Sequence, residues 1–365
     1  MYFAPMVRLQ QLSLLQFRNY LQKHFVFTDR IVGIVGPNGT GKTNVLDAVY
    51  YLSFTKSYFS RPDAQNVHHA HEGMRVEGKY EIKGETTPVT CILRENLKKE
   101  FYFDQEPYTK LSQHIGKIPC VMIAPDDVQI ITGSSEERRK LMDSLLSQMH
   151  PDYLKHLIQY NKILVQRNSL LKNAAETNFL DTLLLETINE QLIENGNIIH
   201  KYRKELITIY LPAILALYQH IAGQQDEIDI QYQSSLNQDT FENLIAQSLS
   251  KDQILQRTNV GIHKDDLQIT IQNQPFKQEA SQGQRKSLLF AIRLAEWNLI
   301  KENKGFSPIL LMDDIFEKLD EQRMIQLLDW VSHSTDGQVF ITDTHKERME
   351  NLLSKHLNRY QLIEL

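Results

Sequence analysis

The sequence predicts an α/β fold with a mixed β-sheet and a β-meander, into which a lobe of helices is inserted. Three observations support this prediction. An apolar strand, a glycine-rich loop and a helix follow one another at residues 30–53. A second apolar strand, at residues 308–312, ends in two carboxylates near the C-terminus. Between these features, residues 126–225 show almost unbroken helical periodicity.

Composition limits the class of protein. The chain has 365 residues, of which 41% are hydrophobic and 23% charged, as in globular proteins with one large or two modest domains. Its net charge of −5 excludes a globally basic nucleic-acid binder but allows a local basic patch. Cys91 and Cys120 form no C-x-x-C pair, so buried reduced thiols are expected and a zinc site is not.

The sequence gives no sign of a membrane segment. No apolar run approaches the roughly 20 residues that span a bilayer, and the N-terminus lacks a signal-peptide pattern. We therefore expect a cytoplasmic protein.

The first elements are strands. Residues 6–17 alternate loosely between apolar and polar side chains, which predicts an edge strand. Residues 25–27 predict a short second strand, and the β-branched run at 30–35 predicts a third strand that is buried.

A glycine-rich loop follows the third strand. Gly36-Pro37-Asn38-Gly39-Thr40-Gly41-Lys42-Thr43 fits G-x-x-x-x-G-K-[ST], the phosphate-binding loop of P-loop NTPases. Glycines let backbone N–H groups turn toward phosphates, and the next helix adds positive potential at its N-terminus. We expect Lys42 to reach the β- and γ-phosphates and Thr43 to hold Mg²⁺. A chance glycine turn is the alternative, but it leaves the flanking strand and helix unexplained.

Strands continue after the loop helix. Residues 74–104 alternate as a β-meander with polar turns, and Ile118–Ala124 predicts another apolar strand. His68, His69 and His71 lie before the meander. They suggest a metal site at first sight, but no carboxylate or cysteine stands at ligand spacing, so an exposed polar loop is expected.

From Ser134 onward, the sequence pattern becomes that of helices. Ser134 and Glu137 form a capping-box pattern that starts a helix, and helical spacing continues to Gly223. Pro212 is expected to kink or restart the last helix. Strands resume at 228–232 and 267–271. The predicted division is therefore an ATPase-like head of residues 1–125 and 226–365, with residues 126–225 as a helical insertion packed as a hairpin or small bundle.

The strand at residues 308–312 completes the predicted nucleotide site. It ends in Asp313 and Asp314, as a Walker B strand does. Asp313 is expected to bind Mg²⁺ opposite Thr43, and Asp314 to orient or deprotonate the attacking water. A core strand with an exposed acidic turn is the alternative.

Ala280 to Ser287 precedes a strong helix and resembles the signature motif of ABC-type ATPases. Ser281 and the backbone of Gly283 would form an anion site at the helix N-terminus. In that class the site caps the γ-phosphate of a partner subunit's ATP. An ordinary Ser-capped helix is the alternative.

Two further segments fit the same class. Leu319-Asp320 matches its D-loop. The strand at 338–342 leads into Asp343 and His345, either of which is a candidate sensor of the γ-phosphate. We favour His345, with a structural loop histidine as the alternative.

Taken together, these motifs resemble the RecF family of SMC-like ABC ATPases over essentially the whole chain. The segments that carry the resemblance are residues 17–20, 36–44, 46–48, 125–127, 133–143, 261–267, 280–286 and 313–320.

The resemblance implies an ATP-dependent head-to-head homodimer with two ATP molecules and Mg²⁺ between the subunits. It implies Lys42, Asp314 and His345 as catalytic residues and Thr43 and Asp313 as metal ligands. It implies nucleotide contacts from Gly36, Pro37, Asn38, Gly39, Thr40, Gly41, Lys42, Thr43, Asn44, Ser281, Gly283 and Gln284.

The resemblance also implies partners. It implies binding of duplex DNA near single-strand gaps with little sequence preference, cooperation with RecR and RecO, help in loading RecA, and weak ATP hydrolysis that resets the dimer. Arg18 is a candidate phosphate contact or a plain surface arginine. Candidates for contacting DNA, each with a solvated surface charge as its alternative, are Lys56, Arg61, Arg138, Arg139, Lys140, Lys201, Arg203 and Lys204.

Three other functions fit parts of the pattern. One is the ATPase subunit of a membrane transporter. Another is an ATPase–nuclease of the overcoming-lysogenization-defect type, which carries a further nuclease domain. The third is an ATP-gated DNA clamp that does not turn over, which a steady-state turnover measurement separates from a true ATPase.

Overall fold

The structure is a computed structural model, and it describes residues 7–59, 62–222, 226–315, 321–333, 336–357 and 359–365. The chain divides into two compact units. Unit 1 comprises Met1–Asp127, Ala216–Gln224 and Lys286–Leu365, and unit 2 comprises Val128–Leu215 and Gln225–Arg285. Helices α5 (Thr182–Ala222) and α8 (Gln282–Lys304) each have residues in both units.

A parallel sheet forms one layer of unit 1. Its strand order is β14-β3-β13-β12-β8. The strands are β3 (Ile31–Val35), β8 (Cys120–Ile123), β12 (Ile309–Met312), β13 (Val339–Asp343) and β14 (Gln361–Glu364). The first four are buried along their whole length, which explains why they are continuous apolar runs in the sequence rather than alternating ones.

An antiparallel sheet of order β2-β1-β4-β5-β6-β7 forms the second layer of unit 1. It contains β1 (Val7–Phe17), β2 (Tyr20–Val26), β4 (Met74–Ile82), β5 (Glu85–Leu93), β6 (Lys99–Phe103) and β7 (Glu106–Pro107). The predicted meander is confirmed. The predicted edge position of β1 is wrong, since β1 pairs with both β2 and β4. Alternation shows which face of a strand is buried but not how many neighbours it has.

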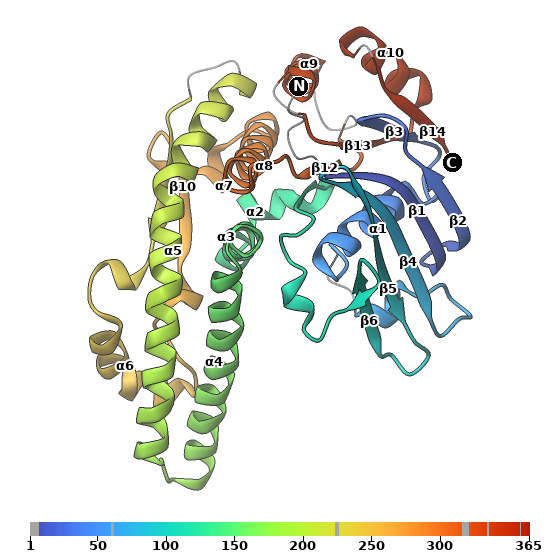
Figure 1. Ribbon diagram of the computed structural model, residues 1–365. Coiled ribbons are helices and arrows are strands. Elements are labelled where there is room, and N and C mark those ends of the chain that lie inside the picture. The colour runs from blue at the N-terminus through green and yellow to red at the C-terminus, as the bar shows by residue number, and fades with distance from the viewer. Residues whose placement is uncertain (1–6, 60–61, 223–225, 316–320, 334–335, 358) are drawn as a thin grey trace. The chain divides into compact units, whose positions relative to one another are not determined.

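Helix α1 (Lys42–Phe54) packs against both sheets, with contacts to β4, β5, β8 and β13 (Figure 1). Every residue from Val45 to Phe54 is buried, as expected for a helix that is covered on all sides. Helix α10 (Lys346–His356) contacts β3 and α9 (Glu321–His333). The core of unit 1 therefore surrounds α1, the helix that follows the glycine-rich loop.

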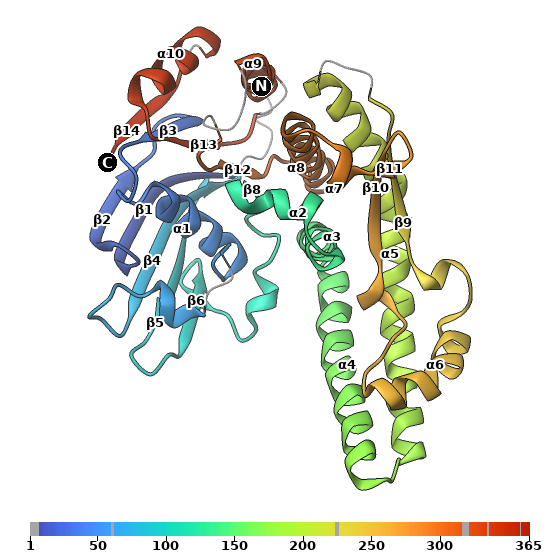
Figure 2. The same ribbon diagram turned by 180° about the vertical axis from the view of Figure 1, so that it is seen from behind.

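Unit 2 combines helices with a small antiparallel sheet of order β11-β10-β9. Helix α4 (Pro151–Thr177) and the part of α5 in this unit form a long hairpin (Figure 1). The remaining elements, seen from behind in Figure 2, are α2 (Gln129–Thr132), α3 (Ser135–Met149), β9 (Ile228–Gln233), α6 (Phe241–Leu255), β10 (Asp266–Ile271), β11 (Gln274–Pro275) and α7 (Phe276–Glu279).

The helix ends follow the sequence signals in part. Ser134 caps α3, and its hydroxyl accepts the N–H of Glu136 at 3.3 Å. Pro212 does not end α5, which continues to Ala222. Buried Leu206, Tyr210 and Ile214 flank Pro212 at spacings of four, so packing holds the helix where the proline removes one hydrogen bond. Gly223, the expected stop, lies outside the described residues.

The division of the chain differs from the predicted one at residues 226–285. The predicted head includes them, whereas they belong to unit 2. The division also differs at residues 126–127 and 216–222, which fall in the predicted insertion but belong to unit 1. Strand β10 contacts α3, and α6 contacts α4. Sequence order alone favours assigning these strands to the head, because they follow the helical segment. In the structure, however, they pack against the helices of unit 2.

Helix α5 corrects the expectation that no segment suits a bilayer. Its best 18-residue stretch has a mean hydropathy of 1.3 with 28% of it buried, so by length and composition alone it is long and apolar enough to cross a membrane. Buried Leu206, Tyr210, Ile214 and Tyr218 recur every four residues. Such a packed stripe is what the core helix of a globular protein shows.

Candidate nucleotide-binding site

The glycine-rich loop joins the end of β3 to the start of α1, both in unit 1. Gly39 and Gly41 have φ angles of 84° and 108°, in the region that favours glycine. A Cβ on Gly41 would lie 2.6 Å from both the Asn19 side chain and the Tyr20 hydroxyl. Glycine is therefore required at this position by backbone conformation and by space.

Lys42 lies inside the loop rather than in solvent. It is 4% exposed, and its Nζ donates to the carbonyl oxygens of Gly36 at 2.8 Å and Pro37 at 3.1 Å. The ammonium group is thus held by the loop that the sequence predicts to surround phosphates. An anion in the loop would offer it stronger, charge-assisted hydrogen bonds than these neutral carbonyls.

Thr43 and Asp313 are 270 positions apart in the sequence and in direct contact in the structure. The Thr43 hydroxyl lies 2.9 Å and 3.1 Å from the two carboxylate oxygens of Asp313. The hydroxyl of Thr342, on β13, donates to the same carboxylate at 2.8 Å. The sequence predicts that Thr43 and Asp313 lie opposite one another across a magnesium ion, but it does not indicate Thr342, which lies in the strand beside β12.

Burial controls the ionisation of Asp313, which is 3% exposed. Desolvation, helped by the nearby charge of Asp314, raises its pKa from 3.8 to about 6, although the hydrogen bonds from Thr342 and Thr43 act in the opposite direction. A buried carboxylate beside a hydroxyl supplies the oxygen ligands that Mg²⁺ prefers. The residues present therefore fit a magnesium ion, with Thr43 and Asp313 as the groups that would hold it.

Asp314 follows the strand in a strained conformation, with φ at 44°. Its backbone N–H donates to the Thr342 hydroxyl at 2.9 Å, so Thr342 bonds both acidic residues. A non-glycine residue in this region costs energy, and such residues cluster at functional sites.

The two candidates for the γ-phosphate sensor differ in environment. Asp343 is 1% exposed and accepts hydrogen bonds from the Arg348 guanidinium and, at 3.0 Å, from the backbone N–H of His345. Its carboxylate is therefore committed to holding the start of α10. His345 is exposed at that start.

Arg18 is mostly buried and lies beside the end of the phosphate loop. It pairs with Asp47 at 2.6 Å and donates to Asn44 and Ser57 at 3.0 Å each, with its side chain 11% exposed. The predicted plain surface arginine is wrong, whereas the predicted phosphate contact of Arg18 stays a prediction. Asp47 faces inward from α1, and nothing in the motif pattern indicated this pairing.

The signature-like segment begins α8, and its first residues belong to unit 2. The Ser281 hydroxyl accepts the N–H of Gln284 at 3.2 Å, and the Gln284 side chain accepts the N–H of Ser281 at 2.8 Å. This reciprocal pair is a capping box, so the ordinary capped helix is present. Gly283 lies within its first turn. Leu319 and Asp320, the expected D-loop, lie outside the described residues.

Half of the eight basic candidates for DNA contact are engaged within unit 2. Arg138 pairs with Asp266 at 2.6 Å, and Arg139 donates to the Asp265 carbonyl at 2.7 Å. Arg203 is 1% exposed, and Lys140 pairs with Glu136 and Glu137. Arg203 is thus a wrong prediction, because its helical phase turns it inward. Lys56, Lys201 and Lys204 are exposed, and Arg61 lies outside the described residues.

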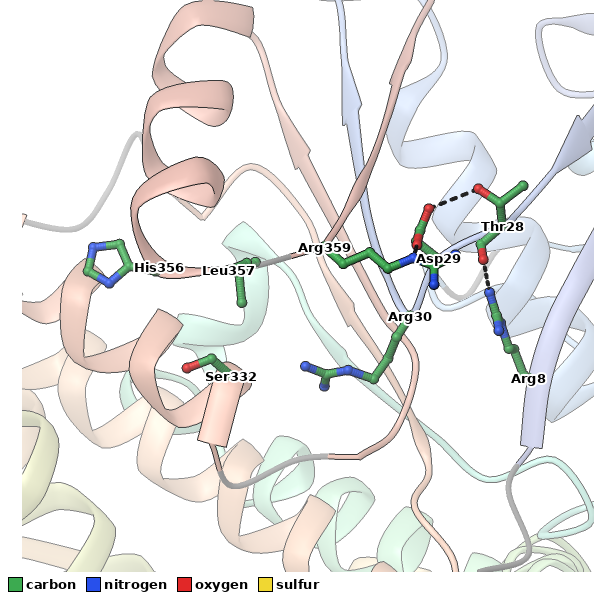
Figure 3. Close-up of a pocket in the computed structure, with 8 residues that line it drawn as sticks. All are labelled: Arg8, Thr28, Asp29, Arg30, Ser332, His356, Leu357 and Arg359. Atoms are coloured by element: carbon green, nitrogen blue, oxygen red, sulfur yellow. Dashed lines mark hydrogen bonds and ion pairs between the residues drawn. The ribbon is translucent and has the colours of Figure 1, made fainter. Parts of the chain in front are cut away.

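A separate cavity of about 470 Å³ lies at the opposite, amino-terminal edge of the parallel sheet (Figure 3). Arg8, Arg30 and Arg359 line it, together with Thr28, Asp29, Ser332, His356 and Leu357. Arg8 donates to the Thr28 carbonyl, Arg30 to those of Val331 and Gly337, and Arg359 to Asp29. These arginines fasten loops in place, and the cavity is distinct from the nucleotide site at the other end of β3.

The described residues contain no group of three or more His, Cys, Asp or Glu side chains that could hold a metal ion. In the histidine-rich loop, His68 and His69 stack with ring centroids 4.6 Å apart, and His68 bonds the backbone carbonyl of His69. These contacts are those of a polar loop.

Comparison with known proteins places this site in a family. The family model described as RecF/RecN/SMC N terminal domain matches residues 8–361. "DNA replication and repair protein RecF" of Flavobacterium johnsoniae is 41% identical over 359 residues, covering 98% of this chain and 100% of that protein. The protein of the same name from Parabacteroides distasonis is 38% identical, covering 98% and 97%.

Solved structures give the same result. The structure described as "recombination mediator protein RecF-ATP in RecFOR pathway" matches with a TM-score of 0.87 and 27% identity, covering 94% of each chain. The Smc head domain from Pyrococcus furiosus matches with a TM-score of 0.56 and 14% identity, covering 97% of this chain and 93% of that one, which shows a shared fold. With a family model and full-length relatives that agree with the geometry of the loop and of Asp313, the chain belongs to the RecF family of SMC-like, ABC-type ATPases.

Proposed function

We propose that the chain is an ATP-dependent DNA-binding protein of DNA replication and recombinational repair. The observation that carries the proposal is the contact of Thr43 with Asp313 beside Lys42 in a closed glycine-rich loop. These are the cation ligands and the phosphate-binding group that an ATPase of this family requires. The names of the full-length relatives support the assignment to replication and repair.

The residues take the following roles in this proposal. Lys42 turns from the Gly36 and Pro37 carbonyls to the β- and γ-phosphates, which the backbone N–H groups of residues 36 and 38–44 also bind. Thr43 and Asp313 hold Mg²⁺, which supplies charge neutralisation when bound. Asp314 orients or deprotonates the attacking water, and His345 senses the γ-phosphate.

The proposed active form is a homodimer. Ser281, Gly283 and Gln284 of one subunit contact the ATP held by the other, so the nucleotide stabilises the dimer by mass action. The dimer binds duplex DNA at single-strand gaps, acts with RecR and RecO to load RecA in the cytoplasm, and is reset by weak, DNA-stimulated hydrolysis.

The test is light scattering on a sizing column of Asp314→Asn with and without Mg·ATP. Blocking hydrolysis should trap the dimer, so a shift from monomer to dimer only with Mg·ATP is expected. A monomer under both conditions, with ATP shown to be bound, would contradict the capping role of Ser281. Measurable steady-state turnover by the unmutated protein is the further expectation that separates it from a clamp that does not hydrolyse ATP.

Lys42→Ala tests the loop itself. The substitution removes the ammonium group that faces the phosphates, so ATP binding and nucleotide-dependent dimerisation should both be abolished. Equilibrium binding of a fluorescent ATP analogue measures the first effect. Unchanged binding would show that the loop does not hold the nucleotide through Lys42.

A further inference from the structure

A buried polar network in unit 1 begins beside the phosphate loop. Asn44, the residue after Thr43, accepts a hydrogen bond from Arg18 at 3.0 Å. Arg18 in turn pairs with Asp47 at 2.6 Å. Asp47 lies on the buried side of α1 and is 0% exposed. A displacement of the start of α1 is therefore passed directly to Asp47 through charge-assisted bonds.

Asp47 connects Arg18 to Ser57 and Tyr58. Its carboxylate accepts the Ser57 hydroxyl at 3.0 Å and the Tyr58 backbone N–H at 2.8 Å. These bonds fix the backbone of Tyr58, whose aromatic ring packs edge-on against Tyr50 at 4.9 Å between centroids. These contacts hold the ring in one orientation, and so they fix the position of the Tyr58 hydroxyl.

The Tyr58 hydroxyl contacts a buried ion pair between Asp127 and Arg293. The Tyr58 hydroxyl donates to the Asp127 carboxylate and accepts from the Arg293 guanidinium at 2.6 Å. Arg293 also lies 3.1 Å from Asp127 and 2.9 Å from Glu296. The three charged side chains are at most 8% exposed. Removing one partner from such a group is costly, since the charges left behind stay out of water.

This ion pair joins two segments that lie close to the boundaries between unit 1 and unit 2 in the sequence. Asp127 is the last residue of the first segment of unit 1, and the chain enters unit 2 at Val128. Arg293 lies on α8, two turns after the point at which this helix enters unit 1 at Lys286. The far end of the network thus holds two segments through which the chain passes between units, and one of them continues the signature helix.

We infer that Tyr58 is a positioning residue that couples the occupancy of the phosphate loop to the start of α8. Tyr58 joins Asp47 at its backbone to Asp127 and Arg293 at its hydroxyl, and it is the member shared by both ends of the network. The inference rests on the proposed nucleotide site, and it adds a connection within one subunit that does not depend on a second copy. Coupling of this kind is a free energy shared by two sites.

The experiment measures hydrogen exchange of backbone amides in residues 286–292 with and without Mg·ATPγS. The parent is the unmutated chain, and every measurement is made at a protein concentration at which light scattering shows a monomer, which leaves the Ser281 cap of α8 in place. In this parent, nucleotide should slow the exchange of these amides about fivefold. This is the factor expected if the coupling free energy equals that of one net hydrogen bond. Tyr58→Phe should reduce the slowing to less than about twofold while the nucleotide still binds.

Tyr51→Phe is the matched control. Tyr51 is also a buried tyrosine and lies on α1, but its hydroxyl bonds Asp63, which is outside the network described above. It should leave the slowing at the parent value. Full slowing in Tyr58→Phe, or equal loss in both variants, would overturn the inference.

Two further outcomes keep the tests separate. If the parent does not bind Mg·ATPγS, the proposed nucleotide function fails. If it binds without any slowing at 286–292, the nucleotide function stands and the coupling is refuted. Should Tyr58→Phe fail to fold, Arg293→Lys replaces it: the lysine keeps the charge beside Asp127 but not the second donor to Tyr58. Its retention of full slowing would likewise overturn the inference.

Discussion

Asp313 shows how one buried residue sets conditions for binding a cation. Its raised pKa of about 6, due mainly to desolvation, means that the folded chain without a cation holds this proton more tightly than the unfolded chain, whose value is 3.8. Between these values the stability contributed by this carboxyl falls as pH rises. Magnesium requires the deprotonated form, so binding of the ion competes with the proton.

Binding of Mg·ATP should therefore weaken as pH falls through 6. Between pH 7 and pH 5 we expect an apparent loss of affinity of about tenfold that is due to Asp313. Titration calorimetry across this range, on the unmutated chain and on Asp313→Asn, measures it. The titration of ATP itself is common to both proteins, so only the difference between the two profiles counts. Parallel profiles would show that Asp313 does not bind the cation.

At this scale the sequence predicts residues whose role is tied to a local motif. Lys42 and Thr43 follow from the loop pattern, and Asp313 follows from its place at the end of an apolar strand. Asp47 and Thr342 could not be found in this way, because their partners come from distant segments. A side chain that bonds across the fold leaves no spacing to recognise.

At the scale of elements, Arg203 holds unit 2 together. From α5 it reaches Asp143 on α3 and Asp265 before β10, each at 2.7 Å, and it donates to the Ile262 carbonyl at 2.7 Å. Its neighbours in sequence, Lys201 and Lys204, are exposed. A run of basic residues on a helix is thus divided by helical phase into two surface charges and one buried connection.

Arg203→Ala should destabilise unit 2 by about 3–5 kcal/mol, because Asp143 and Asp265 lose the partner that offsets their burial. Urea unfolding followed by far-ultraviolet circular dichroism measures the change. Lys204→Ala is the control, with an expected effect within about 0.5 kcal/mol. A loss of less than about 1 kcal/mol for Arg203→Ala would mean that water or other groups replace its bonds.

The sequence predicts the presence of helices and strands better than it predicts which of them pack together. Alternating and helical patterns located the meander and α3, since each pattern reports which face is buried. The same patterns placed β1 at an edge, because they carry no information on what packs beside a strand.

At the scale of the whole molecule, DNA binding should depend on exposed charge rather than on the full set of basic residues. With Arg138, Arg139 and Arg203 engaged internally, Lys201 and Lys204 are the exposed candidates on α5. Contacts of this kind reach phosphates, so they give affinity without base preference.

Replacing both lysines by glutamate should weaken binding of a gapped duplex in the presence of ATP. We expect at least a tenfold loss at low salt, and a salt dependence whose logarithmic slope is flatter by about 1.8 for two lost phosphate contacts. Fluorescence anisotropy over a salt series measures both. Lys162→Glu with Lys172→Glu, exposed on α4, is the matched control. Equal weakening in the two proteins would exclude a specific role for Lys201 and Lys204.

The placement of β3 has a consequence for synthesis on the ribosome. This central strand carries the phosphate loop, yet both of its neighbours, β13 and β14, come from the end of the chain. The whole of unit 2 is translated before either neighbour exists. The nascent chain must therefore keep an apolar strand with two open edges from aggregating until β13 and β14 have been translated. Unit 2 is free to fold first, and nucleotide binding should be the last property that a newly made chain acquires.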